Sequence, residues 1–341
     1  MFRRLSKVWL LAALATLTCA QAALAWNDTG HKIASNIAWN NLKPEIRARV
    51  CELLLKHPQY AVYLEDKTAA TPEEGQLSAF MTAGTWGDLV RSMNGPNAGK
   101  NRLYNHPSWH YVDYPYVVGP LPEGKTPEAP VAEWKPDTDP ANNLQAIQKC
   151  EAQLADPKTS DEEKAVAMAW LMHLVEDLHQ PLHAVSLYSQ EFPDGDKGGN
   201  MLMVNAASNV SNLHALWDSM LGRYQDLPVV KELAAKVAKD NPRDKFAEQL
   251  KITDPKAWAQ ESFTLAKTVV YQNGKLPYVS SQKLRDNKQT PVPELSKEYL
   301  ESAKTVASER LALSGYRLAD ELNRLLAPGA TTAPATGAAN H

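Results

Sequence analysis

A predicted helix that ends at a proline constrains the fold of this chain more than any other feature. Residues 167–184, AMAWLMHLVEDLHQPLHA, are mostly apolar but contain three histidines and two acids. His173 and Asp177 are four residues apart, so a helix places them on one face. The helix should break at Pro181, which lacks an amide hydrogen. His183 would then approach the same volume from the break, which completes a candidate metal-ligand set.

Four further segments contain the same chemical groups. His214 and Asp218 form a second His-x-x-x-Asp pair in NLHALWDSM. Asp88 lies in TWGDLVR, at the end of a predicted helix. His110 lies in SWHYVD, and His31 lies in NDTGHK. Each residue alone has a structural interpretation, as a helix cap or as a buried or exposed histidine. Together they exceed the number of ligands that one tetrahedral ion needs, so we expect a multinuclear metal site.

The type of ligand narrows the choice of metal. The candidates are imidazoles and carboxylates without thiolates, which favours zinc in a catalytic or open site over a structural, cysteine-rich one. Calcium and magnesium prefer shells made of oxygen alone. The ligand types do not exclude iron or manganese, because metal selectivity also depends on the coordination geometry and on which metals are available.

The N-terminus has the organisation of a secretory signal peptide over residues 1–25. A basic start is followed by an apolar core at residues 8–17 and an Ala-Leu-Ala cleavage pattern. Cleavage between Ala25 and Trp26 would give a secreted or periplasmic protein. The apolar run is short for a membrane span, so we expect no membrane association.

The charge of the mature chain excludes one class of nucleic-acid binder. The full chain has 36 Lys and Arg against 39 Asp and Glu, and the signal peptide removes three basic residues and no acids, which leaves about −6. A protein that neutralises many phosphates with its own side chains should be basic. A phosphodiester substrate is still compatible with this charge if bound cations supply the positive charge.

Only Cys51 and Cys150 remain after the predicted signal cleavage, so a single disulfide is the most that the mature chain can form.

Helical periodicity dominates the mature chain. We expect one mainly α-helical domain over residues 26–326, with long loops, at most a short hairpin, and a disordered tail at residues 327–341. Residues 94–140 are rich in Pro, Gly and Asn and should form mostly loop, and residues 201–204 could form a strand. The predicted helices cover residues 30–42, 44–56, 72–91, 160–180, 208–224, 229–239, 255–272 and 296–326.

Six segments in this order resemble the S1/P1 nuclease family, which comprises secreted zinc-dependent nucleases of moulds, plants and bacteria. They are WNDTGHKIASNIA, WGDLVR, WHYVD, AWLMHLVEDLHQPLHA, GGN and NLHALWDSM. GYRLADELNRLL is similar to the last helix of the family, so the resemblance covers about residues 26–326. It implies a fold shared with zinc-dependent phospholipase C and three zinc ions.

The resemblance also implies which residues bind the ions. The first ion would take Asp88, His110, His173 and Asp177, the second His183, His214 and Asp218, and the third His31, Asp177 and Trp26. Trp26 would bind through its free amine and its carbonyl oxygen. That amine exists only after signal cleavage, so processing and metal assembly would be coupled. His57, His106, His179 and His341 match no ligand position.

The implied activity is hydrolysis of phosphodiester bonds in single-stranded DNA and RNA to 5′-phosphorylated products, with 3′-nucleotidase activity as a possible extension. In the family's mechanism a hydroxide held between the first and third ions attacks phosphorus, and the second ion stabilises the departing 3′ oxygen. Asp177 would bridge two ions, Asp113 would orient the attacking water, Asn200 would contact a base and Tyr111 would stack on one. A loop cap, a turn and core packing are the structural alternatives for the last three residues. We expect a monomer without a stable protein partner.

Two alternatives differ in substrate or in class. A zinc-dependent phospholipase C would have the same fold, but its last helical pair is His-x-x-x-Glu, whereas this chain has Asp218 there. A periplasmic zinc-binding protein without catalysis would need neither the bridging Asp177 nor an open ligand set. Both comparisons favour the nuclease.

Overall fold

The structure is a computed structural model that describes residues 26–92 and 97–328. The predicted signal peptide and nearly all of the predicted disordered tail lie outside the described residues. The α-helices are α1 (Asp28–Asn41), α2 (Pro44–Lys56), α3 (Pro72–Leu89), α4 (Ala98–Asn101), α5 (Asn143–Ala155), α6 (Asp161–Leu178), α7 (Leu213–Asp218), α8 (Leu227–Asp240), α9 (Pro255–Leu265), α10 (Ser281–Asp286) and α11 (Lys297–Leu325). The strands are β1 (Tyr114–Val117), β2 (Val185–Tyr188), β3 (Leu202–Ala206), β4 (Asn209–Asn212) and β5 (Val279–Ser280).

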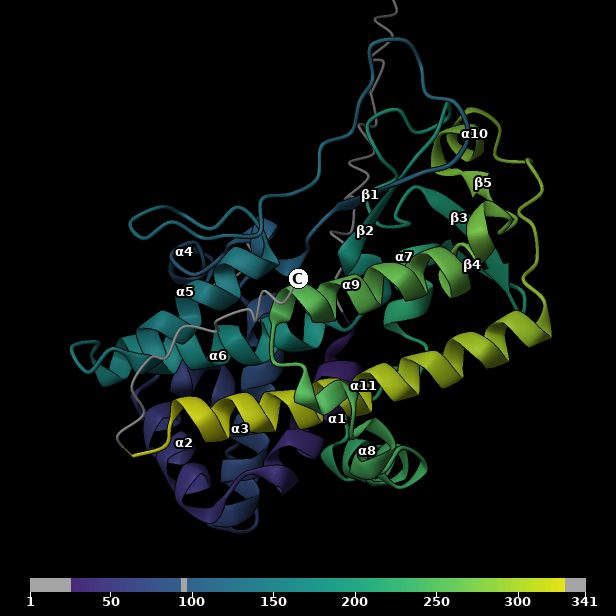
Figure 1. Cartoon of the computed structure of the whole chain (residues 1–341). Coiled ribbons are helices and arrows are strands. Elements are labelled where there is room, and N and C mark those ends of the chain that lie inside the picture. The colour runs from purple at the N-terminus through teal and green to yellow at the C-terminus, as the bar shows by residue number, and fades with distance from the viewer. Residues whose placement is uncertain (1–25, 93–96, 329–341) are drawn as a thin grey trace, which may run out of the picture.

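Helix α6 lies at the centre of the helical part of the molecule (Figure 1). It begins with a capping box, in which the Ser160 hydroxyl accepts from the Glu163 amide and the Glu163 carboxylate accepts from the Ser160 amide. Residues 167–178 are all buried, because α1, α2, α3, α5, α9 and α11 pack around the helix. The helix ends at Leu178, and Pro181 heads a 3₁₀ turn, Pro181–Ala184, as the sequence predicts.

The apolar side chains of the helices form three clusters. The largest surrounds α6 and contains Trp86, Trp109 and Trp170, and the Trp170 ring packs edge-on against each of the other two. A second cluster lies under the strands and α7, around Trp217, and a third joins α1, α8 and α11. The long helix α11 crosses the molecule beside α1, so one element contributes to all three clusters (Figure 1).

The strands lie together at one end of the molecule, at the upper right of Figure 1. Strands β1 and β2 pair in parallel, with Tyr114 opposite Val185, and β3 is the middle strand of an antiparallel sheet in the order β4-β3-β5. The parallel pair matters for the candidate site. Strand β1 follows His110 and β2 follows His183, and the Val112 amide donates to the His183 carbonyl at 2.8 Å. The pairing therefore joins two ligand segments that are distant in sequence.

The mainly α class is confirmed, but three local expectations are wrong. Residues 209–212 form β4 rather than the start of a helix, because they pair with β3, and only Leu213–Asp218 is helical in that region. Helix α5 is absent from the sequence prediction, and the strands exceed the single hairpin that we expected. Cys51 and Cys150 are free thiols, so the disulfide that the sequence allows is not formed. Across residues 26–92 and 97–328, no helix is long and apolar enough to cross a membrane.

A buried ionic network fixes the end of α6 against α9 and α11. Arg317 makes a two-point contact with the Glu261 carboxylate at 2.7 and 2.8 Å, and Arg310 donates to the same carboxylate at 2.9 Å. Arg310 also donates to the carbonyl of His179 at 3.1 Å, the residue that follows α6. Burial alone would raise the pKa of Glu261, but the hydrogen bonds and charges of the two arginines outweigh it and hold the pKa below its ordinary value.

We predict that Glu261→Gln lowers the free energy of unfolding by about 3 kcal/mol, because it leaves two buried guanidinium groups without a counter-charge. Since the folded-state pKa is depressed, this contribution is present at neutral pH and is lost as the pH falls through the folded-state value. Urea unfolding at pH 7 and at pH 4 measures both effects. Glu309→Gln is the control, because its ion pair with Lys245 is more exposed and should contribute less than about 1 kcal/mol. Equal losses in the two variants at pH 7 would contradict the prediction.

Candidate metal centre

Six segments bring the sequence-predicted ligands together. They are α1 with His31, the last turn of α3 with Asp88, the 3₁₀ turn Pro107–His110, α6 with His173 and Asp177, the 3₁₀ turn Pro181–Ala184 with His183, and α7 with His214 and Asp218. Side chains of these residues form three overlapping or adjacent groups that could each hold an ion. The groups are His31, His173 and Asp177; Asp88, His110 and His173; and His183, His214 and Asp218.

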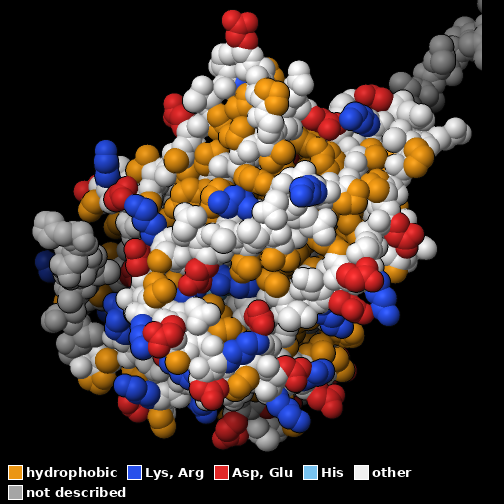
Figure 2. All heavy atoms as spheres, turned by 45° about the vertical axis from the view of Figure 1, so that its right-hand side comes forward, with side chains coloured by type: hydrophobic (Ala, Val, Ile, Leu, Met, Phe, Trp, Pro, Cys, Tyr) orange, Lys and Arg blue, Asp and Glu red, His pale blue; other side chains and the backbone are white. Residues whose placement is uncertain are grey.

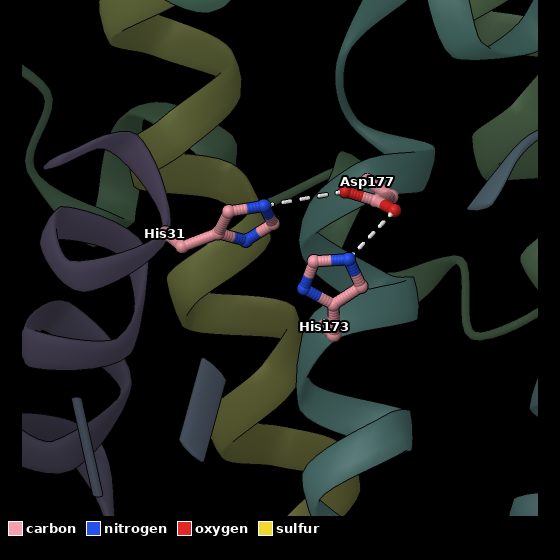
Figure 3. Close-up of side chains that lie close together, drawn as sticks. All are labelled: His31, His173 and Asp177. Carbon is pink, nitrogen blue, oxygen red and sulfur yellow. Dashed lines mark ion pairs between the residues drawn. The ribbon is translucent and has the colours of Figure 1, made fainter. Parts of the chain in front are cut away.

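Asp177 belongs to the first group, where it faces His31 and His173 (Figure 3), and it also contacts His110 of the second group. Its Oδ2 lies 3.2 Å from His173 Nε2 and 3.1 Å from His110 Nδ1, and its Oδ1 lies 3.4 Å from His31 Nε2. The carboxylate therefore faces histidines of α1, of α6 and of the turn before β1 with its two separate oxygens. This arrangement is suited to bridging two ions, as the resemblance implies for this residue.

Asp88 faces the same volume from the end of α3. Its carboxylate oxygens lie 3.8–4.0 Å from nitrogens of His31, His110 and His173, which is too far for direct hydrogen bonds. Spacing of this kind suits donor atoms that point toward a shared ion. Arg91, one helical turn along, donates to Asp88 at 3.4 Å.

The third group lies at the break after α6 and on α7. His183 Nε2 and His214 Nε2 are 3.1 Å apart, and His214 Nε2 lies 3.7 Å from Asp218 Oδ2. Asp218 is fixed in place, because the side-chain amide of Gln180 donates to its Oδ1 at 2.8 Å. The His-x-x-x-Asp spacing thus places the two side chains one helical turn apart on one face of α7.

Hydrogen bonds to the histidines test whether a cation fits. The Nδ1 atoms of His173, His183 and His214 lie 2.8, 2.6 and 2.6 Å from the carbonyl oxygens of Gly84, His110 and Gly198. A carbonyl can only accept, so each Nδ1 carries the hydrogen and each neutral ring turns the lone pair of Nε2 into the cluster. The lone pairs of His183 and His214 then face each other, which is repulsive unless a cation lies between them.

Two buried atoms near Asp177 also indicate that a cation fits the centre. Among the described residues, His31 Nε2 and Asp177 Oδ1 have no hydrogen-bond partner although both are buried. Burial raises the pKa of Asp177 and Asp218 well above the ordinary value and that of Asp88 to about 6. Burial also lowers the pKa of His31, His110 and His183 well below the ordinary value. Every group is thus driven toward its neutral form, which a bound cation would reverse for the carboxylates.

Trp26 lies beside this centre. Its side chain is buried, its indole nitrogen donates to the Glu176 carbonyl at 3.1 Å, and the amide of Asn27 donates to the carbonyl of Asp218 at 3.1 Å. The start of the predicted mature chain therefore contacts the backbone of both α6 and α7. Histidines that match no ligand position lie elsewhere: His57 and His106 contact Trp86 and Trp109, and His179 lies in the ionic network described above.

The predicted residues outside the metal groups have mixed surroundings. Tyr111 is 41% exposed, as a base-stacking ring needs to be. Asp113 is mostly buried, and this burial together with the nearby Asp196 carboxylate raises its pKa to about 7. The amide of Asn200 donates to the Lys197 carbonyl at 2.8 Å, which agrees with the structural alternative of a turn residue.

Two residues at the centre escaped the sequence analysis. Arg91 contacts Asp88 across one helical turn, and its spacing of three residues in TWGDLVR could have shown it. Glu176 contacts His31 at 2.6 Å. An acid within an apolar helix could have indicated such a contact, because a buried charge needs a partner.

Comparison with known proteins identifies the family. The S1/P1 Nuclease family matches residues 26–327. Endonuclease 5 of Arabidopsis thaliana is 35% identical over 171 residues, which cover 47% of this chain and only 50% of that protein. Nuclease S1 of Aspergillus oryzae is 24% identical over 322 residues, which cover 89% of this chain and 93% of that protein. Endonuclease 3 of Arabidopsis thaliana is 24% identical over 337 residues, which cover 94% of this chain and 95% of that protein. The chain belongs to the S1/P1 nuclease family, a class of hydrolases that cleave phosphodiester bonds.

We predict that Gly87→Ala lowers metal affinity by about tenfold or more, within the range found when the support of a ligand is lost. The new Cβ would lie 2.6 Å from Cδ2 and 2.8 Å from Cγ of His173, so the ring must move. Titration of the metal-free protein with zinc measures the change. Gly99→Ala is the matched control, because its Cβ would meet nothing within 4 Å. Equal zinc affinity in the two folded variants would contradict the prediction.

Proposed function

We propose that the protein is a zinc-dependent endonuclease that hydrolyses single-stranded DNA and RNA to 5′-phosphorylated products and also acts on 3′-nucleotides. One observation carries the proposal: the buried Asp177 carboxylate faces His31 with one oxygen and His110 and His173 with the other. A carboxylate in this position, without a hydrogen-bond partner for Oδ1, suits two ions rather than one.

The proposed ligand sets follow the family's pattern. Asp88, His110, His173 and Asp177 hold the first ion, His183, His214 and Asp218 the second, and His31, Asp177 and Trp26 the third. The three groups of side chains support this division, although His173 also lies within reach of the His31 position. The zinc ions would lower the pKa of a coordinated water and neutralise charge on the phosphodiester. The protein's part is to hold the imidazoles neutral and oriented, and hydrogen bonds at Nδ1 do this for His173, His183 and His214.

Electrostatics also favours cations as the source of attraction for the substrate. On the face shown in Figure 2, basic and acidic side chains are interspersed, and the chain as a whole carries a net charge of −3. Arg91 is the basic side chain that contacts a predicted ligand, Asp88. A polyanionic substrate would therefore bind mainly where metal ions concentrate positive charge.

Three residues outside the ligand sets complete the proposed site. Asp113 orients the attacking water, the exposed Tyr111 ring stacks on a base, and Asn200 contacts a base after releasing its bond to the Lys197 carbonyl. We also propose that the protein is secreted or periplasmic after cleavage between Ala25 and Trp26, and that it acts as a monomer.

A direct test uses the processed protein before and after removal of metal. We expect about three zinc ions per chain, hydrolysis of single-stranded DNA, RNA and 3′-AMP, and loss of these activities on chelation with recovery on adding zinc. Asp177→Asn should lose at least about 100-fold in rate, because a misplaced metal and a lost negative charge act together. Activity that survives thorough chelation would overturn the proposal, and hydrolysis of phosphatidylcholine without nuclease activity would favour the phospholipase alternative.

A second prediction concerns pH. Because burial and Asp196 raise the pKa of Asp113 to about 7, its carboxylate forms only as the pH rises through this region, and bound cations would lower the midpoint. The rate of hydrolysis should therefore rise with pH to a plateau. Asp113→Asn should remove this rise and lower kcat by about 100-fold, as expected for a proton-accepting group. Asp194→Asn, at a side chain that is 80% exposed, should leave the profile unchanged. An unaltered profile in Asp113→Asn would exclude this role.

A further inference from the structure

Glu176 is a buried acid whose function the family pattern leaves unassigned. It lies in the last turn of α6, directly before Asp177, but its side chain points to α1. One carboxylate oxygen lies 2.6 Å from His31 Nδ1, and the other accepts a hydrogen bond from the Ser35 hydroxyl at 2.6 Å. Both oxygens are thus used by α1, and the side chain has no exposure to solvent.

The contact with Glu176 determines which nitrogen of His31 faces the cluster. When Nδ1–H donates to the carboxylate, Nε2 presents its lone pair to Asp177 Oδ1 at 3.4 Å and to Asp88 Oδ2 at 3.8 Å. His173, His183 and His214 use backbone carbonyls for the same purpose. A carboxylate is a stronger acceptor than a carbonyl, so it increases the basicity of the ring as well as orienting it.

The backbone of Glu176 contacts the start of the mature chain as well. Its carbonyl accepts from the indole nitrogen of Trp26 at 3.1 Å. The neighbouring helix α3 leaves room for this arrangement only because residue 84 is glycine, since a Cβ there would lie 3.1 Å from both Glu176 oxygens and would overlap the Ser35 hydroxyl. Glu176 therefore contacts both residues, Trp26 and His31, that the proposed third ion requires besides Asp177.

We propose that Glu176 is a positioning residue that orients His31 and Trp26 and so builds the ion position that they share with Asp177. The inference rests on the proposed metal-dependent function. It assigns Glu176 to one of the three positions. In the His183–His214–Asp218 group, Asp218 is oriented by Gln180 and the two histidines by the carbonyls of His110 and Gly198, so that group should keep its ion when Glu176 is changed.

Glu176→Gln in the processed full chain tests this assignment. Ser35 and His31 contact different oxygens of the carboxylate, and an amide replaces one of these oxygens with an NH2 group that can only donate, so one of the two contacts loses its acceptor. We expect the affinity of one zinc ion to fall by about 10–100-fold while the others are retained. Elemental analysis after dialysis against zinc buffers of graded free concentration should then show one equivalent less than the wild-type protein at limiting zinc.

A second measurement begins with the metal-free wild-type protein, where it depends neither on bound metal nor on the folding of a variant. In the metal-free wild-type protein, nitrogen-detected NMR of the His31 ring should show the hydrogen on Nδ1, and Glu176→Gln should weaken this preference. Ser35→Ala keeps the contact between Glu176 and His31 and should have a smaller effect on zinc affinity. Glu321→Gln is the control for the chemical change itself, because this buried carboxylate contacts Arg324 rather than a predicted ligand.

The outcomes separate the two proposals. Three retained ions of unchanged affinity in folded Glu176→Gln, or a wild-type His31 with its hydrogen on Nε2, would overturn the positioning role while leaving the metal-dependent nuclease intact. Loss of zinc in Glu321→Gln to the same extent would also overturn it, because the effect would then be general. A wild-type protein that binds no zinc would overturn the proposed function and this inference with it.

Discussion

The structure depends on one electrostatic constraint, which is that a fully buried carboxylate, Asp177, is surrounded by imidazoles. Neutral histidines that turn their lone pairs toward a carboxylate gain little from it, and burial penalises the charged form of both. A cation changes the sign of these contacts, because each lone pair and each carboxylate oxygen then becomes a ligand. A metal centre would therefore account for the burial of Asp177 within helix α6 at the centre of the molecule.

The rest of the fold holds the predicted ligands in place. His110 and His183 precede β1 and β2, and the parallel pairing of these strands fixes one turn against the other. The ionic network of Glu261 fixes the end of α6, where the chain must turn toward His183. These predicted ligands are thus supported by elements that other contacts of the fold stabilise. This matters because a site held by rigid elements loses less entropy when it binds its ion.

Local patterns in the sequence predicted the parts of the site that depend on local geometry. The two His-x-x-x-Asp pairs and the break at Pro181 need only the helical repeat and the missing amide hydrogen. The contact between Glu176 and His31 spans 145 positions, and no periodicity reveals such a partner. The prediction of a helix failed at residues 209–212 for a similar reason, because their pairing with β3 overrides their helical pattern. The parallel pair β1–β2 also depends on a contact between distant segments, so it could not be read from either segment alone.

The site also shows how a protein with a net negative charge can act on a polyanion. A basic groove attracts phosphates over a long track, and this attraction weakens steeply as salt increases. In the proposed centre, positive charge is concentrated in a few ions whose ligands, Asp88, Asp177 and Asp218, are buried and little screened. Attraction then acts over a few ångströms at the reacting phosphate rather than along the strand. Under the proposed function, selection of the strand would fall to exposed side chains such as Tyr111, which could stack only on unpaired bases.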